Sequence, residues 1–332
     1  MHANTYQALR CEQLSEDLSG LRFVELPVTP PGPGQVAVSM RAAALNFPDL
    51  LMTRGGYQHK PELAYTVGME GAGVIEAVGE GVTGWREGDA VCFSNLVGSI
   101  AQRNLLPATA LEPVPAGWDW ASAAGWRVGA MTAYASLVTR GALQRGETLL
   151  VHGATGGMGA AAVQLGAHLG AKVIATGTRM DWLDMLRPMG ADHLVSSRGL
   201  FQEEVKTLTG GQGADVIYDP VGGDVFDRST KCIAFGGRLL VVGFAAGRIP
   251  TLAANHVLIK TYSVIGVRAG EWLRRRPAEA PAIRAEINRL ASEGVFKPLV
   301  GARYAMSDAI EAIRALGERK APGKIVIDIA AA

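Results

Sequence analysis

Cysteine is scarce in this chain of 332 residues, and its distribution excludes several classes of protein. Cys11, Cys92 and Cys232 are scattered, with no CxxC pair and no histidines at metal-binding spacing. The sequence therefore predicts neither a disulfide framework nor a structural zinc site. The N-terminal segment lacks a charged stretch followed by an apolar one, so we expect no signal peptide and a reducing, cytoplasmic location.

An excess of charge of either sign is also missing. Lys and Arg number 32 against 31 Asp and Glu, so no global field attracts nucleic acid or an anionic membrane. The uncharged run Leu149–Ala171 is long enough to resemble a membrane span, but its six glycines favour a buried strand and helix. We therefore expect neither nucleic-acid nor membrane partners.

A glycine-rich turn is the most informative segment that is present. The strand-like run Thr148–Val151 leads through it into a helix-like segment, Met158–Leu169, and a second strand-like run, Lys172–Thr176. Dinucleotide-binding sites need this context, because glycines let the backbone and a helix N-terminus approach a pyrophosphate. An ordinary tight turn is the alternative, since Ala154 stands where the usual pattern has its first glycine. We assign Ala154, Thr155, Gly156, Gly157, Met158 and Gly159 to cofactor binding.

Short apolar runs alternate with helix-like spacers through the middle of the chain, which is typical of parallel βαβ units. The expected strands are 148–152, 172–176, 193–195, 214–218, 238–242 and 263–267, the six strands of a doubly wound Rossmann sheet. Residues before about 127 indicate a mostly antiparallel, barrel-like domain instead. Helices at 278–292 and 307–317 and a strand at 323–329 follow, and we expect this tail to return to the first domain. The predicted fold is α/β, with domains at 1–126 plus 269–332 and at 127–268.

The whole chain resembles the medium-chain dehydrogenase/reductase superfamily, and within it the zinc-free NADPH:quinone oxidoreductase branch that includes zeta-crystallin. The segments that carry the resemblance are Ala44–Asp49, Val67–Ile75, Gly88–Val91, Met131–Tyr134, the glycine-rich turn and Gly190–Asp192. The resemblance implies a GroES-like, mostly-β catalytic domain beside the Rossmann domain. Zinc-dependent relatives carry two cysteines and a histidine at positions where this chain has Asn46, Met69 and Val128. These residues do not form a zinc shell, so we predict a metal-free enzyme.

The end of the second Rossmann strand predicts the choice of cofactor. An acidic residue there would bind the ribose 2′-hydroxyl of NAD, but this chain has Gly177. Thr178 and Arg179 follow and can instead bond the 2′-phosphate of NADPH, with Arg198 as a further candidate. A solvated surface role is the alternative for Arg179.

The resemblance also implies residues that surround the nicotinamide and the acceptor. The catalytic candidates are Asn46, Asp49, Tyr57, Thr132 and Arg268, with Asn46 and Thr132 also beside the cofactor. Further cofactor candidates are Val242, Gly243 and Phe244, at the carboxyl end of the fifth strand, and Lys324 near the C-terminus. Asp219 fits a turn better than a catalytic base, and His152 fits a structural role better than a catalytic one.

These features together predict NADPH-dependent reduction of quinones or related conjugated carbonyl compounds. Two alternatives stay open: reduction of 2-enoyl thioesters or other activated alkenes, and NADPH binding without turnover, as in a crystallin. A thioester carrying CoA would need a basic channel, for which Arg274–Arg276 are candidates unless they form a solvated helix face. The sixth strand, 263–267, is apolar and should lie at the sheet edge, so we also predict a homodimer.

Overall fold

A computed structural model describes residues 5–329 of the chain, which form two compact units. Unit 1 comprises the described residues up to Val128 and from Pro298 onward, and unit 2 comprises Gly129–Lys297. Residues 269–297, which we expected in the first domain, therefore group with the second. Contacts inside unit 2 explain the difference: Gln164 exchanges two hydrogen bonds with the backbone of Lys297, at 2.7 and 2.9 Å, and the Arg140 guanidinium lies 4.7 Å from the Trp272 ring centre.

Unit 1 is built mainly on antiparallel strands, as the sequence predicted. Among its described residues, a sheet runs in the order β15-β16-β3-β5-β6-β8 with β7 also paired to β3, and a smaller sheet runs β2-β1-β4. The strands are β1 (Thr5–Cys11), β2 (Leu21–Pro27), β3 (Gln35–Ala44), β4 (Tyr65–Thr66), β5 (Glu70–Val78), β6 (Ala90–Ser94), β7 (Arg103–Pro107), β8 (Leu111–Pro113), β15 (Val300–Ala305) and β16 (Lys324–Asp328). The helices are α1 (Phe47–Thr53), η1 (Ala108–Ala110), α2 (Trp120–Ala124), η4 (Met306–Asp308) and α11 (Ala309–Gly317).

The C-terminal strand returns to unit 1, which confirms the expectation for the part of the tail from Pro298 onward. β16 pairs antiparallel with β3, with Val326 opposite Ala44 and Ile327 opposite Ala43, and it pairs in parallel with β15. β16 lies between these two strands, and its residues Lys324–Ile327 are buried. This pairing brings the first residue of β16 close to the segment that follows β3.

Unit 2 is built on the predicted parallel sheet. Its order, β11-β10-β9-β12-β13-β14, is that of a Rossmann sheet, and every strand pair in it is parallel. The strands are β9 (Thr148–Val151), β10 (Lys172–Gly177), β11 (His193–Ser196), β12 (Ala214–Asp219), β13 (Ile233–Val241) and β14 (Ser263–Gly266). β13 begins five residues earlier than the predicted 238, and the other strands start where the apolar runs placed them.

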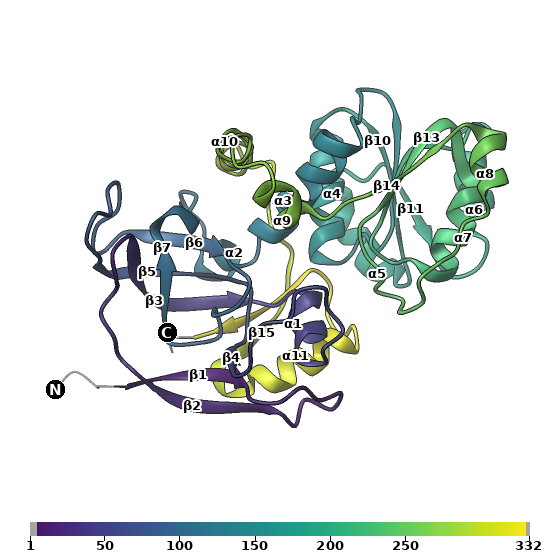
Figure 1. The fold of residues 1–332 in the computed structure, drawn as a ribbon. Helices are drawn as coiled ribbons and strands as arrows, with labels where there is room; N and C mark the ends of the chain where they lie inside the picture. The colour runs from purple at the N-terminus through teal and green to yellow at the C-terminus, as the bar shows by residue number, and fades with distance from the viewer. Residues whose placement is uncertain (1–4, 330–332) are drawn as a thin grey trace. The chain divides into compact units, whose positions relative to one another are not determined.

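Helices cover both faces of this sheet, with α4 on one side and α6, α7 and α8 on the other (Figure 1). The helices are α3 (Arg127–Tyr134), which begins in unit 1, η2 (Ala135–Arg140), α4 (Gly157–His168), α5 (Met180–Leu183), η3 (Asp184–Met189), α6 (Phe201–Leu208), α7 (Gly223–Cys232), α8 (Ala254–Lys260), α9 (Ala269–Arg274) and α10 (Ala280–Ser292). No described helix is long and apolar enough to cross a bilayer.

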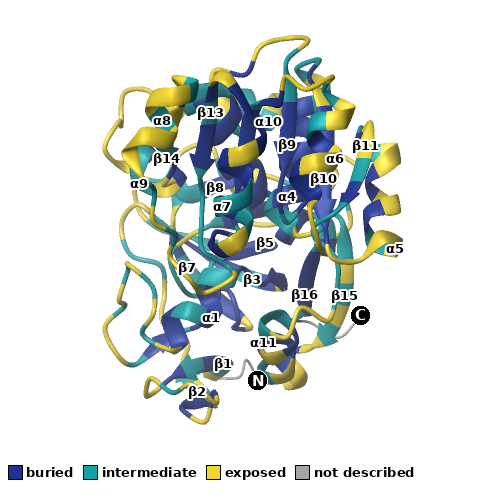
Figure 2. Cartoon of the chain, turned by 90° about the vertical axis from the view of Figure 1, so that its right-hand side faces the viewer, coloured by how far each residue is buried: buried dark blue, intermediate teal, exposed yellow. Residues whose placement is uncertain are grey.

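Burial differs among the strands and helices of unit 2. β9 and β10 lie in its centre and are almost wholly buried, whereas α5 and α8 are largely exposed (Figure 2). α8 has no buried residue, and β14 ends the sheet with neighbours on one side only. The edge position predicted for the sixth strand is therefore confirmed.

Candidate active site

The glycine-rich turn joins β9 to α4 in the way a dinucleotide site requires. Gly153 has a φ of +57°, a left-handed conformation that favours glycine at the start of the turn. A Cβ on Gly159 would lie 2.3 Å from the Gly153 carbonyl oxygen, so helix and turn pack closely only because Gly159 has no side chain. Gly153 thus supplies the turn glycine that we had looked for at Ala154.

Gly156 differs from these two, because the protein's own packing does not demand glycine there. It is the exposed N-cap of α4, and a Cβ would meet its nearest atom, the Gly153 oxygen, at an ordinary 3.4 Å. A bare backbone at the start of a twelve-residue helix leaves N–H groups open to an anion. Gly157 and Met158 continue into the first turn and are partly exposed, while Ala154 is buried. The turn can therefore hold a diphosphate.

The carboxyl end of β10 lies beside this turn. A Cβ on Gly177 would come within 3.3 Å of the Leu183 side chain and 3.6 Å of the Thr155 methyl group, so the backbone around Gly177 is closely packed. An acidic side chain at this position would have to displace its neighbours. Thr178 and Arg179 follow and are exposed, and Arg179 forms an ion pair with Asp181.

The other unit 2 cofactor candidates lie on loops at the same carboxyl edge. Val242 and Gly243 donate backbone hydrogen bonds to the carbonyl oxygen of Asp219, at 2.9 and 3.3 Å, which ties the ends of β12 and β13 together. Phe244 packs against Gly222, where a Cβ would lie 2.9 Å from its ring. Arg198 is exposed in the turn after β11.

Asp219 is a turn residue, as the sequence favoured. Its carboxylate accepts hydrogen bonds from the N–H groups of Val221 and Gly222, at 2.8 and 2.9 Å. Burial raises its pKa to about 6 although both bonds favour the ionised form. Both bonds are accepted by Oδ1 and shape the loop between β12 and α7.

His152 is buried and serves the interior of unit 2. Its Nδ1 lies 2.8 Å from the Thr176 hydroxyl and its Nε2 lies 2.8 Å from the Ser229 hydroxyl. Ser229 already donates its only hydroxyl proton to the Val225 carbonyl, so Nε2–H must donate to Ser229 and Nδ1 must accept from Thr176. Burial lowers the pKa of the imidazole to about 3, which fits this neutral tautomer.

Unit 1 contains a buried polar network formed by the side chains of Asn46, Glu70 and Lys324. Lys324 Nζ donates to Asn46 Oδ1 and to Glu70 Oε2, each at 2.8 Å, and Asn46 Nδ2 donates to Glu70 Oε2 at 3.1 Å. An ammonium only donates and a carboxylate only accepts, so the orientation of the Asn46 amide is determined. The second Glu70 oxygen accepts the Val128 N–H at 2.8 Å. The three side chains are between 0% and 7% exposed, so this network is an internal one.

Asp49 joins the same region from the first turn of α1. Its Oδ2 accepts the backbone N–H of Asn46 at 2.8 Å, which secures the start of the helix. Complete burial raises its pKa to about 7, with Lys324 opposing that shift and Glu70 adding to it. This geometry gives Asp49, one of the catalytic candidates, a role in orienting the loop that carries Asn46.

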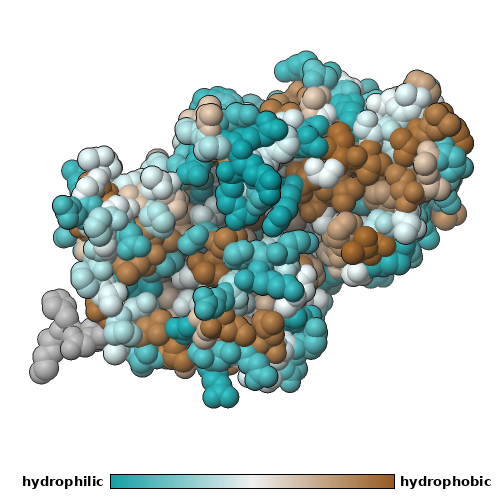
Figure 3. All heavy atoms as spheres, in the orientation of Figure 1, coloured by the Kyte–Doolittle hydropathy of each residue, from teal (hydrophilic) through white to brown (hydrophobic). Residues whose placement is uncertain are grey.

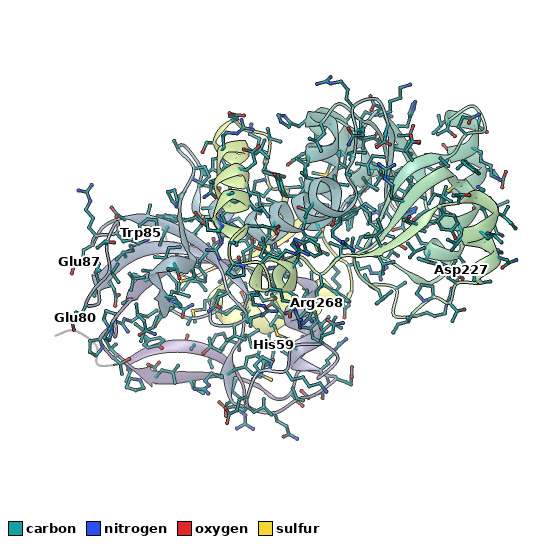
Figure 4. The ribbon with its side chains drawn as sticks, turned by 45° about the horizontal axis from the view of Figure 1, so that its top comes forward. His59, Glu80, Trp85, Glu87, Asp227 and Arg268 are labelled. Carbon is teal, nitrogen blue, oxygen red and sulfur yellow. The ribbon has the colours of Figure 1, made fainter. Side chains whose placement is uncertain are left out.

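The remaining candidates divide between the two units. Tyr57 lies in the loop after α1 and packs on the unit 1 core, whereas Thr132 is buried in α3 of unit 2. Arg268 is exposed at the N-cap of α9, just after β14 (Figure 4). The structure thus assembles Asn46, Asp49 and Lys324 in unit 1 and the glycine-rich turn with Gly177 in unit 2.

Sequence reasoning missed three features of these sites. Glu70 lies inside the segment Val67–Ile75 and no local signal sets it apart, yet it is the residue that joins Asn46, Lys324 and the Val128 N–H. Gly153 was overlooked because the search was for a different glycine spacing. Asp181 was overlooked although an acid two residues after Arg179 is a visible signal. Lys324, assigned to the cofactor, has its ammonium held by two buried unit 1 partners, and its contact with cofactor stays a prediction.

Comparisons with known proteins cover nearly the whole chain. A family profile described as "Alcohol dehydrogenase GroES-like domain" matches residues 32–147, and one described as "Zinc-binding dehydrogenase" matches residues 157–286. The chain is 35% identical over 335 residues to "Quinone oxidoreductase-like protein 2 homolog" of Nematostella vectensis, covering 98% of this chain and 89% of that protein. It is 36% identical over 303 residues to "Mycoketide-CoA synthase" of Mycobacterium tuberculosis, covering 90% of this chain but only 7% of that much longer protein.

Solved structures agree with the fold. The mycobacterial protein Rv1454c, complexed with NADPH, is 29% identical with a TM-score of 0.88, over 97% of this chain and 100% of that chain. CurK enoyl reductase is 26% identical with a TM-score of 0.88, over 98% of this chain and 99% of that chain.

The name of the second profile implies zinc, and the residues of this chain do not fit it. At the positions of the expected ligands stand an amide bound to Lys324, a thioether and an aliphatic side chain, Asn46, Met69 and Val128. Zinc in proteins takes thiolate, imidazole and carboxylate ligands. Within residues 5–329, no group of three or more His, Cys, Asp or Glu side chains is arranged to hold a metal ion.

Proposed function

This chain belongs to the medium-chain dehydrogenase/reductase superfamily, in its quinone oxidoreductase-like branch, and from that premise we propose that it is an NADPH-dependent, zinc-independent reductase of quinones or related conjugated carbonyl compounds. The observation that carries the proposal is the buried network of Asn46, Glu70 and Lys324, in which Asn46 stands where zinc-dependent relatives are expected to carry a ligand. Without a Lewis acid, the acceptor must itself stabilise negative charge, and a quinone or enone does so by conjugation.

The residues of unit 2 hold the cofactor in this proposal. The N–H groups of Gly157 and Met158 bind the diphosphate, Gly177 leaves the ribose without a carboxylate, and Thr178 and Arg179 bind the 2′-phosphate. When bound, the reduced nicotinamide supplies a hydride to the acceptor. NADPH in the complex of the mycobacterial relative supports this choice.

The residues of unit 1 shape the acceptor side. Asn46 is a rigid amide, because Lys324 and Glu70 hold both of its ends, and Asp49 fixes the loop that carries it. Tyr57 lines the acceptor pocket from the loop after α1. Thr132 and Arg268, in unit 2, stay candidates for contact with the cofactor or the acceptor. The reduced acceptor is a stabilised enolate or hydroquinone anion, so protonation from water suffices and no strong acid is required.

The decisive experiment follows the loss of NADPH absorbance with a panel of quinones, enones and 2-enoyl thioesters, after the zinc content of the dialysed protein has been measured. We expect turnover with quinones or enones and far less than one zinc per chain. About one tightly held zinc per chain, lost together with activity on chelation, would contradict the proposal.

Reduction of 2-enoyl thioesters is the second candidate, favoured by the likeness to CurK enoyl reductase. The basic run Arg274–Arg276 does not strengthen it, because Glu271 pairs with two of these arginines and Glu279 with the third. Turnover of the thioesters alone would establish this candidate. NADPH binding without turnover of any acceptor would indicate a crystallin-like binding protein.

Replacing Arg179 by alanine tests the cofactor assignment. We expect the KM for NADPH to rise with little change for NADH, because only NADPH carries the 2′-phosphate. Steady-state kinetics with both cofactors measures this. An equal loss with both would mean that Arg179 acts on the fold rather than on the phosphate.

A further inference from the structure

We propose that Asp181 is a specificity-determining residue that weakens the grip of Arg179 on a 2′-phosphate, so that this chain discriminates less between NADPH and NADH than Gly177 and Arg179 alone would allow. The inference rests on the proposed binding of NADPH. It concerns a residue that neither the glycine-rich turn nor the family motifs include.

The guanidinium of Arg179 is already engaged by a carboxylate. Arg179 Nε donates to Asp181 Oδ1 at 3.0 Å, and Nη2 donates to Asp181 Oδ2 at 2.6 Å. This is the two-pronged geometry with which arginine binds a carboxylate or a phosphate. Asp181 therefore occupies the fork that a phosphate would use best.

Trp182 holds the pair in this orientation. The Arg179 guanidinium carbon lies 4.5 Å from the Trp182 ring centre, so the charged plane rests against the indole. Arg179, Asp181 and Trp182 lie within four consecutive positions at the start of α5, directly after the end of β10. The ion pair with Asp181 and the contact with the Trp182 ring therefore both stabilise this orientation of the Arg179 side chain.

The net charge of the Arg179–Asp181 pair determines how strongly it attracts a bound 2′-phosphate. Arg179 and Asp181 together are neutral, so a 2′-phosphate gains attraction from the cation and meets repulsion from the carboxylate two residues away. Both side chains are more than half exposed, at 51% and 60%, so water and salt screen these effects and keep them modest. Removing the carboxylate charge should strengthen binding of the 2′-phosphate by about three- to tenfold.

Orientation of the guanidinium by Asp181 would have the opposite effect on phosphate binding, so the test distinguishes orientation from charge. Three guanidinium N–H groups remain beyond the two that Asp181 accepts, since arginine has five. If Asp181 served to aim these at the phosphate, its loss would weaken binding. The proposal takes the charge effect to be the larger, because an exposed pair gives little orientation.

The experiment is calorimetric titration of the full-length protein with 2′,5′-ADP and with 5′-AMP, which differ in the 2′-phosphate. The variant is Asp181→Asn. The control is Asp184→Asn, which removes the same charge from a carboxylate whose partner, at 3.3 Å, is Arg187. We expect Asp181→Asn to tighten 2′,5′-ADP about three- to tenfold with 5′-AMP unchanged, and Asp184→Asn to change neither by more than about twofold.

An unchanged or weakened affinity of Asp181→Asn for 2′,5′-ADP, with the wild type binding normally, overturns the inference and leaves the proposed function intact. An equal gain in Asp184→Asn also overturns it, because the effect would then be one of overall charge. A wild-type protein that binds neither 2′,5′-ADP nor NADPH overturns the proposed function itself.

Discussion

At the scale of single residues, burial shifts the pKa values of two ionisable groups, His152 and Asp49, in opposite directions. His152 is kept neutral, with a pKa lowered to about 3, whereas the pKa of Asp49 is raised to about 7. Both shifts follow from burial, which disfavours a charge of either sign. Their effects on stability have opposite dependence on pH.

His152 should make the protein less stable as the pH falls from about 6.5 toward 3. Over this window the unfolded chain, with a histidine pKa of about 6.5, binds a proton that the folded state does not. The free energy of unfolding should therefore rise with pH by up to about 1.4 kcal/mol per unit, and the contribution should be constant above pH 6.5. Urea unfolding of the wild type and His152→Gln between pH 4 and 7 measures it. Parallel curves for the two proteins would contradict this assignment.

Asp49 should act in the other direction. Its folded pKa of about 7 lies above the ordinary value, so its contribution is present below about pH 3.9 and is lost as the pH rises through 7. Asp49→Asn cannot ionise but keeps an oxygen to accept the Asn46 N–H. We expect the variant to lose the decline in stability between pH 4 and 7, as measured by thermal unfolding. A variant whose decline matches that of the wild type would show that Asp49 is ionised when folded.

At the scale of elements, one carboxylate connects three segments of unit 1. Glu70 opens β5, Lys324 opens β16 and Asn46 precedes α1, and all three side chains meet in the interior. A buried ion pair contributes little when compared with apolar packing, but it is costly to break on one side only. The network therefore makes the placement of each element depend on the others.

Lys324→Met should destabilise unit 1 by about 3–5 kcal/mol, because it leaves the Glu70 carboxylate buried without its cation. Adding Glu70→Gln should recover part of this loss. Lys320→Met is the matched control, since Lys320 pairs with Glu318 at the surface and is 57% exposed, so its loss should cost less than about 1 kcal/mol. Chemical unfolding of the single and double variants measures the coupling. Additive losses would mean that the two charges do not interact.

At the scale of the whole molecule, the surface of unit 2 carries the case for a homodimer, which we propose. β14 is an edge strand, and hydrophobic side chains gather over β14 and α8 (Figure 3). The exposed apolar residues in this part of the chain include Phe235, Leu258, Ile259 and Val264, with Leu258 78% exposed. An apolar sheet edge of this kind is usually protected by a partner, and a two-fold axis beside β14 would join two sheets into a closed pair.

Val264→Pro should weaken association while the unit 2 sheet stays folded. The Val267 N–H donates to Val241 of β13, and N–H groups alternate in direction along a strand, so the Val264 N–H points toward the open edge. Proline removes that outward donor and no bond to β13. Light scattering measures the mass, with circular dichroism to check folding and Leu258→Asp as a second disruptive variant. A monomeric wild type at micromolar concentration would refute the dimer.

The sequence by itself determined the features that depend on local order. Alternating apolar runs and spacers located the six Rossmann strands, and their order in the sheet is the one typical of that fold. The sequence also predicted the glycine-rich turn and Gly177 at the end of β10, since each depends on neighbours a few residues away. The sequence did not show to which domain residues 269–297 belong, because that depends on contacts between distant residues, such as Gln164 with Lys297.

Only the tertiary structure decided which polar groups meet. Lys324 and Glu70 are 254 residues apart in sequence, and Asn46 and Glu70 are 24 apart, so no local pattern relates them. Pairing of β16 with β3 and of β3 with β5 brings them together, and burial then makes their hydrogen bonds obligatory. The tautomer of His152 has the same origin, because it depends on Ser229 from a helix 77 residues away. Periodicity and glycine act along the chain, whereas charge and hydrogen bonding act through space.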